Sequence, residues 1–234
     1  MRFEVNLSMV EIYNERVQDL LIDPSLRPVG GLKVREHKTL GVYVQDLSKY
    51  PVDSYAAIDD KMEEGQRNRT IGSTAMNATS SRAHTIITIE FKQVSFHEGK
   101  PSERFSVINL VDLAGSEKSG QTGATGDRLK EGASINLSLT MLGQCISVLA
   151  DKAGGKRKNE VVPYRNSSLT RILQNALGGN SKTIMICAIS PAFLNYEETL
   201  STLRYADNAK KIQNKAVINE SVQDRIIREL KEEN

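Results

Sequence analysis

Residues 105–117 read FSVINLVDLAGSE, a segment that begins as an almost unbroken apolar run and ends in a turn. Such a run predicts a β-strand that is buried on both faces. Asp112 stands at its end, and Gly115 follows three residues later. A carboxylate there can hold Mg²⁺, directly or through water, and a bare glycine N–H can approach a terminal phosphate. Because Asp and Gly also serve plain turns, this segment alone is a weak indication of a phosphate site.

A second polar segment, residues 77–84 (NATSSRAH), precedes an alternating stretch that predicts a strand over residues 85–94. The hydroxyls of Ser80 and Ser81 can ligate Mg²⁺ or orient a water molecule. Arg82 can pair with Glu117 and so close two loops over a γ-phosphate. The alternative is a polar loop that enters a strand, and for His84 alone we favour a histidine that is satisfied in the core.

The composition is that of a soluble globular protein with one sizeable core. The chain has 234 residues, 39% of them apolar, and a formal net charge of +2. No apolar run is long enough to span a membrane, and the first residues do not form a signal peptide. Cys145 and Cys187 fall in helical and strand-like patterns, so we expect both to be reduced and buried. With so small a net charge, an acidic partner has to be met by local patches.

The rest of the chain alternates between strand-like and helical patterns, which indicates an α/β protein. We expect strands over residues 2–13 and 183–189, a hairpin over 32–44, and antiparallel pairing of 85–94 with 105–113. Helical spacing occurs at 17–21, from Tyr55 to a stop at Gly65, and at 135–149, 169–177 and 200–212.

The sequence GQTG at residues 120–123 superficially resembles the start of a phosphate-binding P-loop. A P-loop requires G-x-x-x-x-G-K-[ST], in which the backbone amides wrap the phosphates while the lysine and the hydroxyl reach the γ-phosphate and Mg²⁺. No lysine follows the glycine here, and the segment follows the wrong strand. We therefore reject this interpretation.

Taken together, NATSSRAH and LVDLAGSE resemble the switch I and switch II loops of the kinesin motor domain. The resemblance extends from Phe3 to the end of the chain, because further motifs occur in the family's order: VEIYNERVQDLL, LKEGASINLSL, VPYRNSSLTRIL, LGGNSKT and ETLSTLRYADNAKKI. It covers the C-terminal two-thirds of such a domain. LKVREH, LGVYVQDLS and AVINE are most similar to the kinesin-three, vesicle-transport branch.

This resemblance implies a P-loop NTPase-like fold: a central mixed, largely buried sheet with helices on both faces, without its N-terminal part. It implies a partial motor domain at residues 1–212, a neck linker at 213–224, and the start of a neck helix or coiled coil at 225–234. The implied activity is microtubule-stimulated ATP hydrolysis coupled to movement along microtubules, with ATP and Mg²⁺ as cofactors. The implied partners are microtubules and a second copy through the neck, and the implied location is the cytoplasm and its microtubule cytoskeleton, with no nucleic acid and no membrane span.

The same resemblance assigns residue roles. Ser80 and Ser81 would serve the γ-phosphate, the attacking water and Mg²⁺, and Asp112 would hold Mg²⁺ through water. Gly115 would sense the γ-phosphate, and Arg82 with Glu117 would latch the two switches. Asn77 completes the nucleotide set. The microtubule contacts would be Lys33, Arg35, Asn136 in the relay helix, Lys156, Arg157, Lys158, Tyr164, Arg165 and Arg171. A basic loop meets an acidic surface in a salt-dependent way, whereas the alternative for such a loop is simple solvation.

Three departures from the family pattern leave a second hypothesis open. Ala83 stands where serine is usual, Leu137 stands where lysine is usual, and the 234 residues contain no P-loop, first strand or base-binding segment. Without the P-loop amides and lysine, we expect this chain alone to bind ATP barely. The leading hypothesis is an incomplete copy of an ATP-driven motor; the alternative is a non-hydrolysing microtubule-binding or regulatory module. Nucleic-acid binding is disfavoured, because only 5% of residues are aromatic and none lies in the basic loop.

Overall fold

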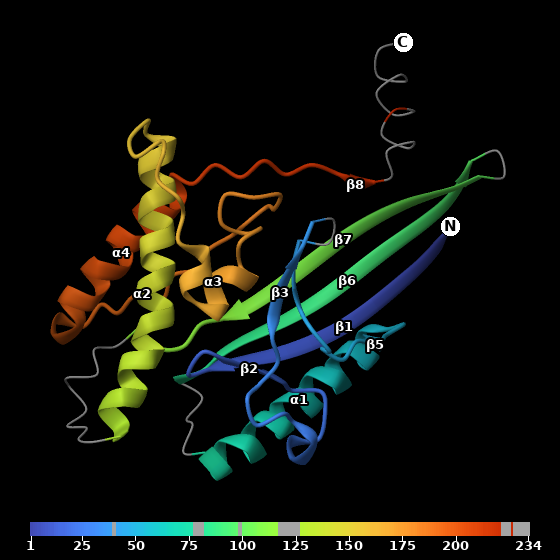
Figure 1. Cartoon of the computed structure of the whole chain (residues 1–234), viewed down its shortest axis with the longest axis horizontal. Helices are drawn as coiled ribbons and strands as arrows, with labels where there is room; N and C mark the ends of the chain where they lie inside the picture. The colour runs from blue at the N-terminus through green and yellow to red at the C-terminus, as the bar shows by residue number, and fades with distance from the viewer. Residues whose placement is uncertain (39–40, 77–81, 98–99, 117–126, 221–225, 227–234) are drawn as a thin grey trace.

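The computed structural model describes residues 1–38, 41–76, 82–97, 100–116, 127–220 and 226. Its centre is a sheet of three long strands, β1 (Arg2–Tyr13), β6 (His84–His97) and β7 (Lys100–Asp112). Shorter strands extend it: β2 (Arg16–Asp19) and β5 (Tyr50–Pro51) pair with β1, and β8 (Asn219–Glu220) pairs with β7. The order is β2-β1-β6-β7-β8, and each of these pairs is antiparallel (Figure 1). The predicted pairing of 85–94 with 105–113 is confirmed.

Helices cover both faces of this sheet. Because successive residues of a strand point to opposite faces, β1 contributes to two separate cores. Val10 and Ile12 pack with Leu142 and Ile146 of α2 (Asp127–Ala153). Leu7 and Met9 of β1 instead pack with Ile58 and Met62 of α1 (Tyr55–Met76). The expected α/β class with helices on both faces is thus confirmed.

Most of the remaining elements lie on the α2 side of the sheet, whereas the 3₁₀ turn at Pro24–Leu26 contacts α1. The hairpin of β3 (Val34–His37) and β4 (Gly41–Val44) forms as predicted, and α3 (Ser168–Ile172) packs against it. The final helix, α4 (Tyr196–Lys210), packs against α2. Short 3₁₀ turns cover Pro24–Leu26, Tyr164–Asn166 and Phe193–Asn195. None of the helices in the described part of the chain is long and apolar enough to cross a membrane. Both cysteines are free, Cys145 buried and Cys187 half-buried.

Three predicted helices differ from the observed elements. Residues 17–21 lie in and just after β2, because Asn14 and Glu15 adopt positive φ angles of 51° and 61°. Those angles produce the tight turn that joins two antiparallel strands. Helix α1 continues through Gly65, where a Cβ atom would lie 2.3 Å from the Met9 sulfur, so close packing rather than helix termination explains this glycine. The helix expected at 169–177 is α3, which ends at Ile172.

The prediction that 105–111 is buried on both faces was wrong. Val107, Leu110 and Val111 remain 44%, 49% and 38% exposed. Strand β7 pairs with β6 along its whole length, but within the described residues its other edge is paired only at Arg104 and Phe105, with β8. The remainder of that edge and the adjoining faces therefore lack a covering element among these residues.

The strand predicted over residues 183–189 is also not formed. This segment belongs to no ladder in the described part of the chain, and Ile184 and Ile186 are 89% and 92% exposed. A strand exists only where a neighbour satisfies its backbone N–H and C=O groups. The apolar sequence is suited to a sheet position, but it has no neighbour in this arrangement.

Candidate functional site

Antiparallel pairing of β6 and β7 brings the two predicted switch segments to the same end of the sheet. Thr85, near the start of β6, is the register partner of Asp112, the last residue of β7. Arg82 lies just before β6, and Gly115 lies three residues after β7. The structure therefore brings Arg82, Asp112 and Gly115 to one sheet end. The predicted site residues Asn77, Ser80, Ser81 and Glu117 lie outside the described residues.

His84 connects this site to helix α2. Its side chain is only 2% exposed. The backbone N–H of Ala114 donates to Nδ1 at 2.9 Å, and Nε2 lies 2.7 Å from the Ser138 hydroxyl oxygen. Burial lowers the pKa of His84 to about 4, although the charge of Asp112 opposes the shift. The preferred interpretation of His84 as a satisfied core residue agrees with this burial. Its two partners, from two other segments, were not foreseen.

The Asp112 carboxylate at this end of the sheet is a suitable ligand for Mg²⁺ that is bound to a nucleotide. Asp112 is exposed, so its carboxylate is free to face a ligand. Among the described residues, no group of three or more His, Cys, Asp or Glu side chains could hold a metal ion by itself. Mg²⁺ is commonly bound by one or two carboxylates together with substrate phosphates rather than by a protein cage. Asp112 therefore fits a metal that arrives with a phosphate ligand.

The basic loop after α2 is exposed but partly neutralised. Lys156, Arg157 and Lys158 all face solvent. Arg157 pairs with Glu160 through two hydrogen bonds and lies 3.4 Å from Asp151, and the bond to Glu160 is the largest cause of its raised pKa. Within the described part of the chain neither lysine forms an ion pair, so Lys156 and Lys158 carry the remaining positive charge of the loop.

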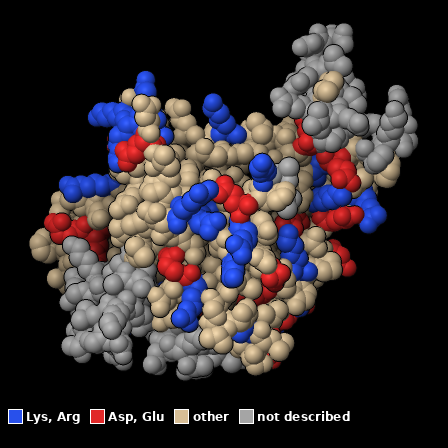
Figure 2. Space-filling view, in the orientation of Figure 1, with Lys and Arg blue, Asp and Glu red and all other residues tan. Residues whose placement is uncertain are grey.

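The other predicted basic contacts lie on the β3–β4 hairpin and on the segment leading into α3. Lys33 and Arg35 are exposed, and Arg35 donates to the Gln45 side chain at 3.1 Å. Arg165 is 3.0 Å from Glu36 of β3, so it links the two segments. Arg171 is half-buried on α3. In Figure 2, Lys and Arg side chains gather over the β3 region and the upper end of α2, with acidic side chains between them.

Two predicted contact residues have different environments from the basic ones. Tyr164 is half-buried, its hydroxyl donates to the Leu177 carbonyl, and burial raises its pKa to about 12. The Tyr164 hydroxyl is therefore engaged in a hydrogen bond within the protein. Asn136 lies within α2, but its side chain is outside those described. Of the two single residues that depart from the family pattern, Ala83 is buried and Leu137 is 40% exposed.

Two connections were missed at the level of sequence. The Glu15 carboxylate accepts from the Ser167 hydroxyl at 2.9 Å and from the Ser168 N–H at 2.6 Å, which anchors the β1–β2 turn to the start of α3. Ser138 is the α2 partner of His84. The one available signal was that Ser138 falls at helical spacing inside an otherwise apolar stripe, where a polar side chain needs a partner.

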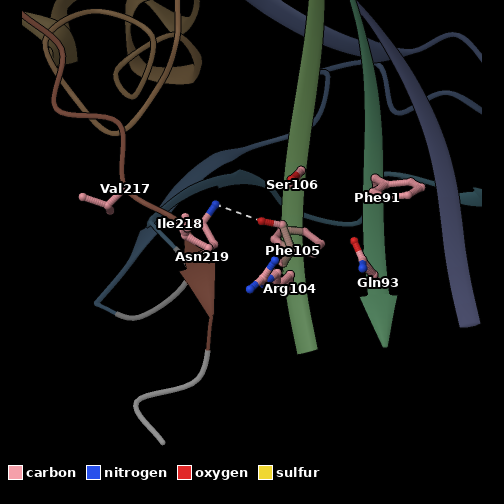
Figure 3. A pocket seen from close by; sticks show the side chains of 8 residues that line it. All are labelled: Phe91, Gln93, Arg104, Phe105, Ser106, Val217, Ile218 and Asn219. Carbon is pink, nitrogen blue, oxygen red and sulfur yellow. Dashed lines mark hydrogen bonds between the residues drawn. The ribbon is translucent and has the colours of Figure 1, made fainter. Parts of the chain in front are cut away.

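A small pocket lies near the middle of β7, at Arg104–Ser106, away from the strand end that carries Asp112. It lies between β6, β7 and the segment that leads into β8, and Figure 3 shows Phe91, Phe105 and Val217 among its lining residues. The Asn219 side chain donates to the Phe105 carbonyl at 3.0 Å. Part of the predicted neck linker, residues 213–224, is thus held against the sheet edge.

Comparison with known proteins assigns the chain to a family. The sequence model of the kinesin motor domain family matches residues 1–212. The chain is 56% identical over 233 residues to Kinesin-related protein 1 of Dictyostelium discoideum, covering 99% of this chain and 10% of that protein. It is 57% identical to human kinesin-like protein KIF1C and 54% identical to human KIF13B, covering 99% of this chain and 21% and 13% of those proteins. The chain thus spans about a fifth or less of the length of these curated relatives.

Two solved structures are similar as well. A KIF14 dimer in a two-heads-bound state, with AMP-PNP and in complex with a microtubule, superposes with a TM-score of 0.84 at 45% identity, covering 97% of this chain and 63% of that one. A fast kinesin gives 0.82 at 44% identity, covering 94% and 59%. The resemblance to the kinesin-three branch is confirmed by the KIF1 and KIF13 relatives. The chain belongs to the kinesin motor domain family.

Proposed function

We propose that this chain supplies the phosphate-sensing loops and the microtubule-binding surface of an ATP-driven microtubule motor. The observation that carries the proposal is the meeting of Arg82, Asp112 and Gly115 at one end of the sheet. His84 connects the same place to the middle of α2, whose C-terminal end leads into the basic loop. A phosphate site and a charged surface are thus joined by one rigid helix.

The described residues suit distinct roles at the phosphate site. Asp112 would hold Mg²⁺ through water, and the Gly115 N–H would approach the terminal phosphate. Bound Mg²⁺ would neutralise phosphate charge there. Arg82 would pair with Glu117 when the two loops close, and Asn77, Ser80 and Ser81 would complete the set around the phosphates and the attacking water.

The proposed partner is a microtubule, and the proposed location is the cytoplasmic microtubule cytoskeleton. The exposed Lys156 and Lys158, with Lys33, Arg35 and Arg165 on neighbouring segments, offer positive charge to an acidic surface. The similar KIF14 structure is itself a complex with a microtubule, which supports the same partner for this chain. The neck segments at 213–224 and 225–234 would connect the motor to a second copy.

The uncovered part of β7 supports a longer functional unit. A free strand edge beside exposed apolar side chains is a place where another strand pairs. The segment at 183–189 is apolar and largely exposed, and it pairs with no strand among the described residues, so an additional strand could pair with it or with the open edge of β7. We propose that this strand and a P-loop come from residues outside these 234, since both similar solved chains extend further than this one.

The test is steady-state ATP turnover by the full-length protein, with and without microtubules. Asp112→Asn keeps the size of the side chain but removes its charge, and we expect the microtubule-stimulated rate to fall about 10- to 100-fold. Asp207→Asn, the same change at an exposed carboxylate of α4 that pairs with Lys211, is the control and should leave the rate unchanged. An active Asp112→Asn enzyme would contradict the proposed role. Microtubule binding without ATP turnover by the wild type would favour the non-hydrolysing alternative.

A further inference from the structure

We propose that His84 is a positioning residue that ties the backbone beside Gly115 to helix α2, so that displacement of α2 changes the geometry of the phosphate-sensing loop. This inference rests on the proposed motor function. It assigns to one side chain the task of communicating between the microtubule-facing helix and the nucleotide site.

The bridge uses both nitrogens of the ring. A backbone N–H can only donate, so Nδ1 is the acceptor for Ala114 and the ring proton lies on Nε2. Nε2 therefore donates to the Ser138 hydroxyl oxygen. The ring thus joins three segments, namely the start of β6, the loop after β7 and the middle of α2. His84, Ala114 and Ser138 are 2%, 5% and 3% exposed, so water does not compete readily for these bonds.

The three connected segments differ in how firmly they are held. His84 is the first residue of β6 and is the register partner of Ile12 of β1, so the sheet holds the backbone of His84 in place. Ala114 stands outside any strand, one residue before Gly115. Ser138 lies on α2, a separate element that packs against α3 and α4. A shift of α2 therefore stretches the Ser138 bond or turns the ring, and the ring in turn determines where the Ala114 amide lies.

Helix α2 also spans the distance to the basic surface. About 22 Å of helix separate Ser138 from Ala153, and the basic loop begins there. A force that a bound filament exerts on Lys156 and Lys158 is transmitted along this helix. Coupling between two sites is carried by packed side chains, hydrogen bonds and secondary-structure elements that connect them, and the His84–Ser138 bond joins α2 to the loop beside Gly115.

Three variants separate positioning from simple core stability. Ser138→Ala removes the α2 end of the bridge. His84→Asn places an amide oxygen near the position of Nδ1, so it can keep the Ala114 bond while it loses Ser138. Cys145→Ala is the matched control, because Cys145 is fully buried on the same helix and its replacement removes a buried polarizable atom without touching the bridge.

The first measurement is the tautomer of His84 in the full-length protein, by ¹⁵N NMR of the imidazole nitrogens. Protonation at Nε2 is expected, and protonation at Nδ1 would overturn the bridge whatever the enzyme's activity. The second measurement is the ratio of microtubule-stimulated to basal ATP turnover. We expect Ser138→Ala and His84→Asn to lower that ratio about fivefold or more, while Cys145→Ala leaves it at the wild-type value.

The outcomes distinguish this inference from the proposed function. A stimulated wild type together with an unchanged ratio in Ser138→Ala would overturn the positioning role alone. An equal fall in Cys145→Ala would also overturn it, because the effect would then follow from lost packing. A wild type whose turnover does not respond to microtubules would overturn the motor function and this inference with it.

Discussion

Replacing Lys156 and Lys158 together with alanine should weaken microtubule binding, and the structure indicates how strongly. Residues 151–160 carry four basic and two acidic side chains. Arg157 already pairs with Glu160 and Asp151, so the two lysines account for the net positive charge of the loop. Removing both leaves the loop neutral.

The expected effect follows from the exposure of these side chains. An exposed ion pair contributes about 0.2–1 kcal/mol, so the loss of two such contacts should cost about 0.4–2 kcal/mol. That cost corresponds to a Kd raised about 2- to 30-fold. Because the Debye length falls from about 10 Å at 0.1 M salt to about 3 Å at 1 M, the difference between variant and wild type should vanish at high salt.

The assay is co-sedimentation of the full-length protein with microtubules across a salt series. The control is Lys49→Ala with Lys92→Ala, which removes the same charge from an exposed lysine near β5 and a half-buried lysine on β6, both far from the loop (Figure 1). An unchanged Kd at low salt would refute the role of the loop. Equal weakening by the control would show that the total charge of the protein matters, and not this surface.

Three further predictions concern other parts of the molecule. Gly65→Ala should lower the free energy of unfolding measured with urea, because overpacking against Met9 costs about 1–3 kcal/mol and exceeds the helix-propensity gain of about 0.5–1 kcal/mol. In a Met9→Ala background the same change should become stabilising. A Gly65→Ala substitution that still lowers the free energy of unfolding in that background would contradict the packing explanation. The pKa of His84 falls from 6.5 to about 4 on folding, so between these pH values the unfolded chain holds a proton on this histidine and the folded chain does not. The free energy of unfolding therefore decreases as the pH falls from 6.5 towards 4. Between pH 7 and 5 this should cost roughly 2 kcal/mol, a loss that His84→Asn should abolish; parallel pH profiles of the two proteins would refute the assignment. The 234-residue chain alone should show no saturable binding in a titration with fluorescent ATP, since its sequence contains no P-loop; micromolar affinity would disprove this.

Local patterns predicted the paired elements of this fold well. Alternation identified β1 and β6, and the helical spacing of Leu142 and Ile146 identified α2, because in each case one face is buried against a partner that the chain itself supplies. The same reasoning failed for 183–189, whose apolar run requires a neighbouring strand that the described residues do not provide. A pattern reports the environment that a segment is suited to, and only the packing shows whether that environment is present.

The candidate site was predictable in part. The positions of Asp112 and Gly115 after a strand were readable from the sequence, and antiparallel pairing with β6 places Arg82 at the same end. The link from His84 to Ser138 was not readable, since it joins residues 54 positions apart through one ring. The neutralisation of Arg157 was equally hidden, because it depends on a turn that brings Glu160 and Asp151 to the same guanidinium.

The central claim is that ATP hydrolysis and microtubule binding are coupled in one protein. The most direct measurement is ATP turnover by the full-length protein as a function of microtubule concentration. We predict a low basal rate that rises to saturation, with a half-saturating concentration that increases with salt as the basic surface is screened. A rate that stays flat at every microtubule concentration, in a protein that still binds the filament, would contradict the account.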